Sequence, residues 1–186
     1  DKIFSAGADL KSWIGRKVRM TELWQTQRGM LLNRGLEIWK PVIAAINGHC
    51  VGGGMTLMLA TDIRVSASHA TFGLSEVKRG IIAANGGTQR IPDQLPYAIA
   101  MEMLLTGDAI DAQAALRWGL INQVVPSGQE LDAALAYARR IAANAPLAVQ
   151  AAKELALRAR QPGLAAGLRF EQFVNHILQR TEDAQE

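Results

Sequence analysis

The stretch Ile46-Asn-Gly-His-Cys-Val-Gly-Gly-Gly-Met-Thr-Leu-Met-Leu-Ala-Thr-Asp62 joins an apolar strand pattern to an apolar helix pattern through three consecutive glycines. Glycine has no Cβ, so a ligand can approach the backbone closely at such a junction. The first N–H groups of a helix lack intrahelical partners and carry the positive end of the helix dipole. The junction can therefore hold a negative oxygen, either a phosphate or a developing oxyanion. Tight packing alone is the alternative use of these glycines.

Strand and helix patterns alternate over the first half of the chain, whereas the second half is almost entirely helical in pattern. Residues 42–46 and 63–65 have the continuous apolar character of short buried strands, and they flank the glycine-rich helix. Such an order predicts an α/β core at residues 1–95 and a helical region at residues 96–186.

Several residues mark where the predicted helices begin and end. Asp111 is suited to cap a helix that Gly119 ends, because an aspartate oxygen accepts hydrogen bonds from the unpaired N–H groups of a first turn. Ser127-Gly-Gln-Glu130 has the form of a capping box that starts the next helix, and Pro146 suits the first turn of the one after it. Earlier in the chain, residues 13–39 have mostly helical spacing.

Further short motifs accompany the glycine triplet: Phe4-Ser-Ala-Gly-Ala-Asp-Leu-Lys11, Phe72-Gly-Leu-Ser-Glu-Val-Lys-Arg-Gly80, Gly86-Gly-Thr-Gln-Arg-Ile91 and Leu105-Thr-Gly-Asp108. In this order and spacing, the motifs resemble those of the crotonase family, the enoyl-CoA hydratase/isomerase superfamily. The resemblance covers essentially the whole chain. It is specific for the family and much less specific for the reaction.

The resemblance implies an α/β fold, a crotonase-type spiral of ββα units with a C-terminal helical lobe that packs trimers. We therefore expect a homotrimer, or a hexamer built as a dimer of trimers. Phe170 and Phe173 could serve that interface, or they could face their own core as amphipathic stripes commonly do. Relatives carry strands and a helix before the position of Asp1. The chain is thus expected to be an N-terminally truncated fragment without the first units or any targeting segment.

The same resemblance implies that a coenzyme A thioester is the substrate, with no permanently bound cofactor, and that two backbone N–H groups stabilise its enolate. By motif position these N–H groups belong to Ala8 and Gly53. Two preorganised donors favour a charge that appears only in the transition state. For Asp9, a helix N-cap is the alternative to substrate contact. The residues expected to contact substrate are Ala6, Gly7, Asp9, Leu10, Gly52, Gly54, Thr56 and Ala84.

Glu76 is the acid/base that the resemblance implies. Enoyl-CoA hydratases usually have two glutamates, but the other position falls on Thr56, which cannot act as a carboxylate base. An apolar pocket would raise the pKa of the Glu76 carboxyl by desolvation, which is useful for moving protons near neutral pH. A solvated surface glutamate is the alternative. The side chains expected to line the pocket around it are Met55, Ile81, Ile82 and Ala83.

One glutamate suffices for more than one reaction. Glu76 could carry a proton between C2 and C4 of an enoyl-CoA, or it could deprotonate water and return that proton to C2. Relatives that isomerise dienoyl-CoA have aspartates at the positions of Thr56 and Ala84, so that reaction is not expected. A hydroxycinnamoyl-CoA-type hydratase/lyase and a catalytically weak acyl-CoA-binding paralogue remain alternatives.

Composition bounds the other classes of protein. The 186 residues are 49% hydrophobic and 20% charged, which is typical of a soluble globular protein. One cysteine rules out an internal disulfide and is compatible with a reducing compartment, so we expect a cytoplasmic protein. No apolar stretch approaches the roughly 18 residues that cross a bilayer. The spread charge of +3 does not favour a nucleic-acid partner, and the histidines lack metal-ligand spacing.

Overall fold

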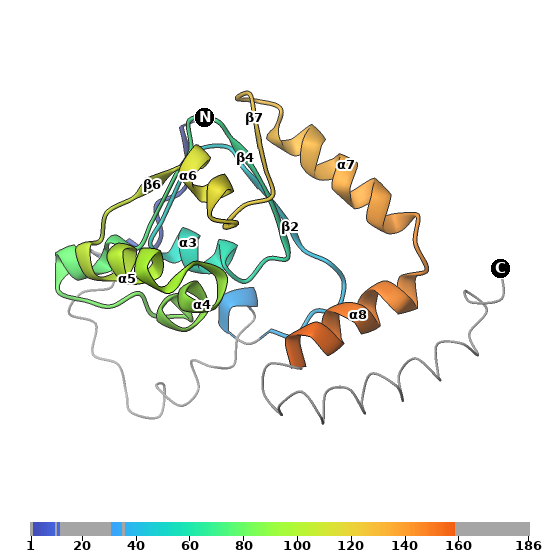
Figure 1. The fold of residues 1–186 in the computed structure, drawn as a ribbon, viewed down its shortest axis with the longest axis horizontal. Helices are drawn as coiled ribbons and strands as arrows, with labels where there is room; N and C mark the ends of the chain where they lie inside the picture. Colours follow the sequence, from blue (N-terminus) through green and yellow to red (C-terminus); the bar gives the residue numbers. More distant parts are fainter. Residues whose placement is uncertain (1, 10, 12–30, 35, 159–186) are drawn as a thin grey trace. The chain divides into compact units, whose positions relative to one another are not determined.

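The computed structural model describes residues 2–9, 11, 31–34 and 36–158 (Figure 1). Expectations for Leu10, for the chain between residues 12 and 30, and for Phe170 and Phe173 lie outside this part. The elements in chain order are β1 (Ile3–Ser5), η1 (Leu32–Arg34), β2 (Ile43–Ile46), β3 (His49–Val51), α3 (Gly53–Met58), β4 (Ile63–Ala67), β5 (Thr71–Gly73), η2 (Ser75–Arg79), α4 (Gly87–Gln94), α5 (Tyr97–Thr106), β6 (Ile110–Asp111), α6 (Ala112–Arg117), β7 (Gln123–Val125), α7 (Glu130–Ala142) and α8 (Pro146–Arg158).

Contacts within the chain define two units. The first combines Asp1–Glu37 with Ile43–Ala134, and the second combines Ile38–Val42 with Leu135–Glu186. Helices α5 and α6 therefore contact the α/β part more than they contact the later helices. The predicted division after residue 95 separates the chain by helix content, whereas these two units separate it by contacts. The predicted division therefore stays a prediction.

The first unit contains two small sheets, which confirms the predicted α/β class. Strands β1, β3, β5 and β6 form one sheet, in which β1, β3 and β5 are parallel and β6 is antiparallel to β5. Strands β2, β4 and β7 form the other sheet, with every pair parallel. Consecutive strands β2 and β3 belong to different sheets, so the chain changes sheets just before the glycine triplet. Helix α3 follows directly and packs against β3 and β1.

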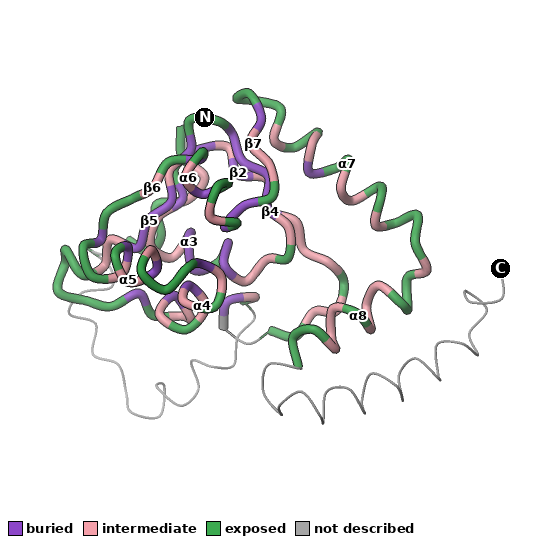
Figure 2. Tube along the Cα trace, in the orientation of Figure 1, coloured by how far each residue is buried: buried purple, intermediate pink, exposed green. Residues whose placement is uncertain are grey.

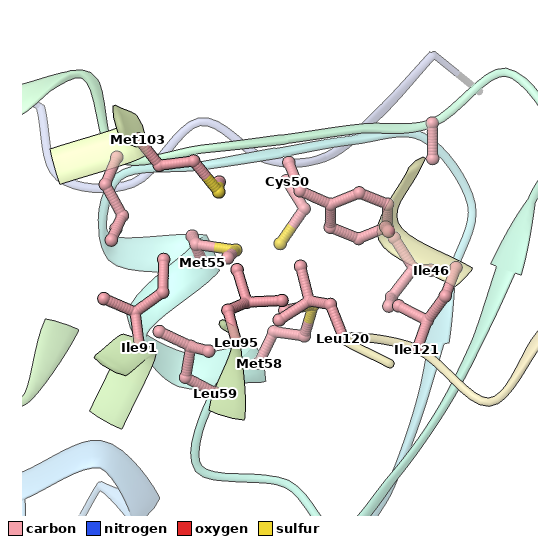
Figure 3. Packing of buried hydrophobic residues seen from close by; sticks show 14 of the residues in the cluster. Ile46, Cys50, Met55, Met58, Leu59, Ile91, Leu95, Met103, Leu120 and Ile121 are labelled. Atoms are coloured by element: carbon pink, nitrogen blue, oxygen red, sulfur yellow. The ribbon is translucent and has the colours of Figure 1, made fainter. Parts of the chain in front are cut away.

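The core of the first unit forms where α3 meets the strands and α4. Met55 and Met58 of α3 are fully buried, as are Cys50 of β3 and Ile91 of α4. Figure 3 shows these side chains interleaved, with the sulfur atoms of Cys50 and Met55 inside the cluster. Burial raises the pKa of the Cys50 thiol to about 12, so the thiol stays protonated and serves as a small apolar group.

Burial falls off along the last two helices described. Ala134 is the one buried residue of α7, and no residue of α8 is buried (Figure 2). Within the second unit, the Arg158 guanidinium lies 5.1 Å from the centre of the Trp39 ring. No helix in the described ranges is long and apolar enough to cross a bilayer.

The predicted helix boundaries are correct where a single side chain decides them. The Asp111 carboxylate accepts a hydrogen bond from the Ala114 N–H at 2.7 Å and caps α6. Gly119 follows α6 with a φ of 77°, and α8 begins at Pro146 as predicted.

Two predicted helix boundaries differ from the structure. The predicted helix after Ser127 is present as α7 (Glu130–Ala142), but it begins later than the capping box predicts, and the Glu130 carboxylate instead accepts a hydrogen bond from the Gly128 N–H at 2.8 Å. In the described end of the helix predicted at residues 13–39, the chain forms a short 3₁₀ turn at Leu32–Arg34, and residues 36–39 are irregular. Trp39 packs under Arg158 in the second unit, so tertiary contacts override local spacing there.

Candidate active site

A pocket of about 490 Å³ opens in the first unit. Its walls come from the turn after β1, from η1, from the β3–α3 junction and from η2 with the loop behind it. Distant parts of the sequence therefore meet at one place. The residues predicted from the sequence that line this pocket are Ala6, Gly7, Ala8, Gly52, Gly53, Thr56, Glu76 and Ala84.

Two further predicted contact residues do not line the pocket. Gly54 packs against β1, since an added Cβ there would lie 2.5 Å from the Ser5 Cβ. The Asp9 carboxylate accepts a hydrogen bond from the Lys11 N–H at 3.0 Å, as its alternative capping role requires. Geometry therefore assigns Gly54 to packing and gives Asp9 a local backbone partner.

The turn after β1 and the start of α3 touch backbone to backbone. Gly7 has a φ of 84°, and a Cβ built on it would lie 2.6 Å from the Gly53 nitrogen. A Cβ on Gly53 would in turn lie 3.5 Å from the Ala8 nitrogen. Gly53 is the first residue of α3, so its N–H has no intrahelical acceptor. The backbone at Ala8 and the first residue of α3 thus lie close together at the wall of the pocket.

Glu76 lies on η2 with its carboxyl against this junction. Its Oε1 is 3.7 Å from the point that a Gly52 Cβ would occupy. Its Oε2 is buried and has no hydrogen-bond partner among the described residues. Burial raises the pKa of the half-buried Glu76 carboxyl, and a hydrogen bond from its own backbone N–H opposes this rise. The Glu76 carboxyl therefore takes up a proton more readily than an ordinary glutamate does.

The apolar wall near Glu76 is only partly the predicted one. Ile81 and Ile82 line the pocket, and both are exposed there, at 40% and 67%. Met55 and Ala83 are instead buried in the core. Met55 of α3 belongs to the same buried cluster as Cys50 of β3, so it is part of the core instead of the pocket wall.

Thr56 has a fully buried side chain, and it is hydrogen-bonded twice. Its hydroxyl donates to the Gly53 carbonyl oxygen at 3.0 Å and accepts from the Asn33 side-chain amide at 3.0 Å. Asn33 is itself 7% exposed and lines the pocket. Asn33 is a pocket residue that the sequence did not predict, because an asparagine at the end of a helical pattern carries no signal that it will be buried.

Arg90 connects two walls of the pocket. Its guanidinium Nη1 donates to the Asn33 carbonyl oxygen at 3.2 Å and to the Asn85 carbonyl oxygen at 3.1 Å. Burial lowers the pKa of Arg90 below its ordinary value. Because these acceptors come from η1 and from the loop before α4, Arg90 fixes the spacing between them.

The contact between Gly7 and Gly53 predicts a large effect of a single methyl group. Gly128→Ala is the matched control, because Gly128 has a φ of 88° and nothing lies within 4 Å of its added Cβ. The control should lose about 1–2 kcal/mol of unfolding free energy, through backbone strain alone. Gly7→Ala should lose about 1–3 kcal/mol more, because its Cβ collides with backbone. Urea unfolding of both variants measures the difference, and equal losses would contradict the close contact.

Burial of Glu76 predicts a pH-dependent stability difference between the wild type and Glu76→Gln. The folded state raises the pKa above its ordinary 4.5, so ionising the carboxyl is harder in the folded than in the unfolded chain. The wild type should lose stability relative to Glu76→Gln as the pH rises above 4.5, and the two should converge at lower pH. Urea midpoints at pH 4 and pH 8 measure this, with the surface variant Glu102→Gln as control. A constant difference across pH would contradict the burial.

The chain is similar to known proteins over its whole length. The family described as Enoyl-CoA hydratase/isomerase matches residues 1–186. The chain is 40% identical to (E)-benzylidenesuccinyl-CoA hydratase of Thauera aromatica over 186 residues, which is all of this chain and 72% of that protein. It is 38% identical to 2,3-dehydroadipyl-CoA hydratase of Escherichia coli strain K12 over 185 residues, again covering 100% and 72% of the two chains.

The fold is similar to solved structures of the same kind. An enoyl-CoA hydratase from Bacillus anthracis superposes with a TM-score of 0.89 at 37% identity, over 100% of this chain and 72% of that one. The chain spans between 59% and 72% of the length of the curated relatives that it matches. The family model, the alignment with the Thauera aromatica hydratase and the superposition on the Bacillus anthracis structure each cover the whole chain. The chain therefore belongs to the enoyl-CoA hydratase/isomerase family, the crotonase superfamily.

Proposed function

We propose that the protein adds water to a 2-enoyl-CoA thioester, with Glu76 as the single acid/base. One observation carries this proposal: the half-buried Glu76 carboxyl lies in the same pocket as the Ala8–Gly53 backbone junction. Addition of water to an enoyl thioester needs a base for the water and donors for the negative oxygen that develops. Both kinds of group line the pocket, within one compact unit.

The proposed reaction proceeds in two steps. Glu76 takes a proton from water as the water oxygen bonds to C3, and the electrons of the C2=C3 bond move to the thioester oxygen. The N–H groups of Ala8 and Gly53 stabilise the resulting enolate. The enolate then collapses, and C2 takes the proton back from the Glu76 carboxyl. Water is added overall, and the carboxylate is regenerated.

Hydration is the preferred choice among the reactions open to one glutamate. Both curated relatives described above are named hydratases. Isomerisation of a 3-enoyl-CoA would use the same carboxyl and the same N–H groups without water. Cleavage of a hydroxycinnamoyl-type thioester and acyl-CoA binding without turnover are the remaining alternatives. Assembly as a trimer or as a dimer of trimers stays a prediction.

Glu76→Gln tests the acid/base role. The amide keeps the size of the side chain but cannot accept a proton, so hydration of crotonyl-CoA should fall by about 10²- to 10⁴-fold. Binding of the thioester should change little, because the backbone donors are unaltered. Products from crotonyl-CoA and from 3-hexenoyl-CoA are followed by chromatography and mass, with Glu102→Gln as control.

Each outcome of that experiment has a clear reading. A water adduct of crotonyl-CoA that is lost in Glu76→Gln supports the proposal. Conversion of 3-hexenoyl-CoA to its 2-enoyl isomer without hydration would make the protein an isomerase. Unchanged turnover in Glu76→Gln would remove Glu76 from the chemistry. Binding of both thioesters without any turnover would indicate an acyl-CoA-binding protein or a specialised substrate.

Arg79 favours a narrower class of acyl group, one that ends in a carboxylate. Of the described residues that line the pocket, Arg79 alone has a cationic side chain. It is exposed, and it lies on η2 three residues after Glu76. Guanidinium groups bind carboxylates through paired hydrogen bonds. A succinyl or adipyl group bound through one carboxyl keeps its other carboxyl free, and both curated relatives are named for such acyl groups.

Arg79→Met should therefore raise KM selectively. We expect KM to rise by about 10- to 100-fold for 2,3-dehydroadipyl-CoA and by less than about 3-fold for crotonyl-CoA, because only the former ends in a carboxylate. Lys78→Met is the matched control, since Lys78 pairs with Asp108 at the surface and does not line the pocket. An equal rise in KM for both substrates would indicate that Arg79 contacts the coenzyme A portion instead.

A further inference from the structure

We propose that the side-chain oxygen of Asn33 holds the water molecule that Glu76 activates. This inference rests on the proposed hydration and adds to it a second acceptor for the attacking water. Family resemblance alone leaves that acceptor unassigned, because Thr56 stands where hydratases have a glutamate. The Asn33 oxygen can accept from water only if the amide turns that oxygen away from Thr56.

The hydrogen bonds of Thr56 fix that orientation. The Thr56 Oγ1 lies 3.0 Å from the Gly53 carbonyl oxygen, and only the hydroxyl hydrogen can make this contact favourable. Because that hydrogen is used, the group that faces Oγ1 from Asn33 at 3.0 Å must be a donor. The Asn33 Nδ2 therefore faces Thr56, and the Asn33 Oδ1 is turned away from it.

Asn33 Oδ1 is a buried acceptor that calls for a donor. It has no hydrogen-bond partner among the described residues, and the residue is 7% exposed. Buried side-chain oxygens almost always accept a hydrogen bond from protein or from an ordered molecule. Asn33 lines the same pocket as Glu76, so a small molecule in that pocket can supply the hydrogen.

The first turn of α3 connects Asn33 with Glu76. The Thr56 N–H donates to the Gly52 carbonyl oxygen at 3.0 Å, so these residues are one helical turn apart. The Glu76 carboxyl lies against Gly52 at one end of the turn, and the Asn33 amide meets Thr56 at the other. The two acceptor groups therefore flank the same turn of helix.

Water is the donor that this pair of acceptors fits. A water molecule between a carboxylate and an amide oxygen donates one hydrogen to each, which leaves an oxygen lone pair free to attack C3. Thr56 is the poorer second acceptor, because it is 1% exposed and its hydroxyl already makes two hydrogen bonds, whereas the Asn33 side-chain oxygen makes none among the described residues. Thr56 is thus a positioning residue that holds the Asn33 amide in place.

Asn33 takes no proton in this scheme. As the water oxygen bonds to C3, one hydrogen passes to Glu76 and later to C2. The other hydrogen stays on oxygen, becomes the hydroxyl hydrogen of the 3-hydroxyacyl product, and continues to donate to Asn33 Oδ1. Asn33 therefore matters for water addition but not for formation of the enolate.

Two reactions of the same pocket separate these roles. Hydration of crotonyl-CoA needs water, Glu76 and the oxyanion donors. Exchange of the C2 hydrogens of butyryl-CoA in heavy water needs Glu76 and the oxyanion donors but adds no water. Asn33→Leu should lower kcat/KM for hydration by about 10- to 100-fold, while the exchange rate stays within about 3-fold of wild type.

Two further variants sharpen the test. Asn33→Asp keeps an acceptor oxygen that faces the pocket, and the Thr56 hydroxyl can turn from the Gly53 carbonyl to donate to the second carboxylate oxygen, so hydration should stay within about 10-fold of wild type. Asn144→Leu makes the leucine change at an exposed position of the second unit and should alter neither reaction. If Asn33→Leu does not fold, Thr56→Val decides, since it is nearly isosteric and should lower hydration more than exchange.

The failures are distinct. Equal loss of hydration and exchange in the folded Asn33 and Thr56 variants would show a structural role only, and would overturn the inference while leaving the hydratase proposal intact. Unchanged hydration in Asn33→Leu would overturn it too. A wild-type protein that exchanges the C2 hydrogens but adds no water would refute the hydratase proposal, and the Asn33 inference with it.

Discussion

The backbone contact between Gly7 and Gly53 is the constraint on which the site depends. An added Cβ on Gly7 would lie 2.6 Å from the Gly53 nitrogen, so the turn after β1 and the first turn of α3 leave no room for a side chain between them. Parallel pairing of β1 with β3 brings the two turns to the same edge of the sheet. The unpaired N–H groups at the start of α3 are thereby brought next to a second segment at the wall of the pocket, which is the arrangement on which the proposed enolate stabilisation rests.

Polar groups around this contact are organised by burial. Arg90 holds η1 and the loop before α4 through two carbonyl oxygens, and Thr56 connects η1 to α3 through Asn33. These hydrogen bonds lie inside or at the edge of the core, where unpaired polar groups are costly and paired ones are therefore well ordered. Among the described residues, Glu76 and Asn33 are the pocket-lining residues that have a buried side-chain oxygen without a hydrogen-bond partner, and the proposed chemistry uses these two oxygens.

The motifs around the glycine triplet and Glu76 were sufficient to predict the family, the α/β class and most of the pocket lining. Their chemistry is local: a glycine at positive φ or an aspartate cap is determined by the residue itself and its immediate neighbours. Boundaries that depend on distant contacts were harder to predict. The helical spacing that runs up to Trp39 does not continue as an α-helix through the described residues 36–39, and α7 starts at Glu130, later than the capping-box pattern predicted.

By itself, the sequence determined which backbone positions can approach closely and which single carboxyl stands beside them. Only the tertiary structure decided that Asn33 meets Thr56, that Gly54 packs on Ser5 instead of facing the pocket, and that Met55 belongs to the core. The reason is physical. Glycine conformations and caps follow from short-range sterics, whereas the burial of one polar side chain depends on which segments the two sheets and α3 bring together.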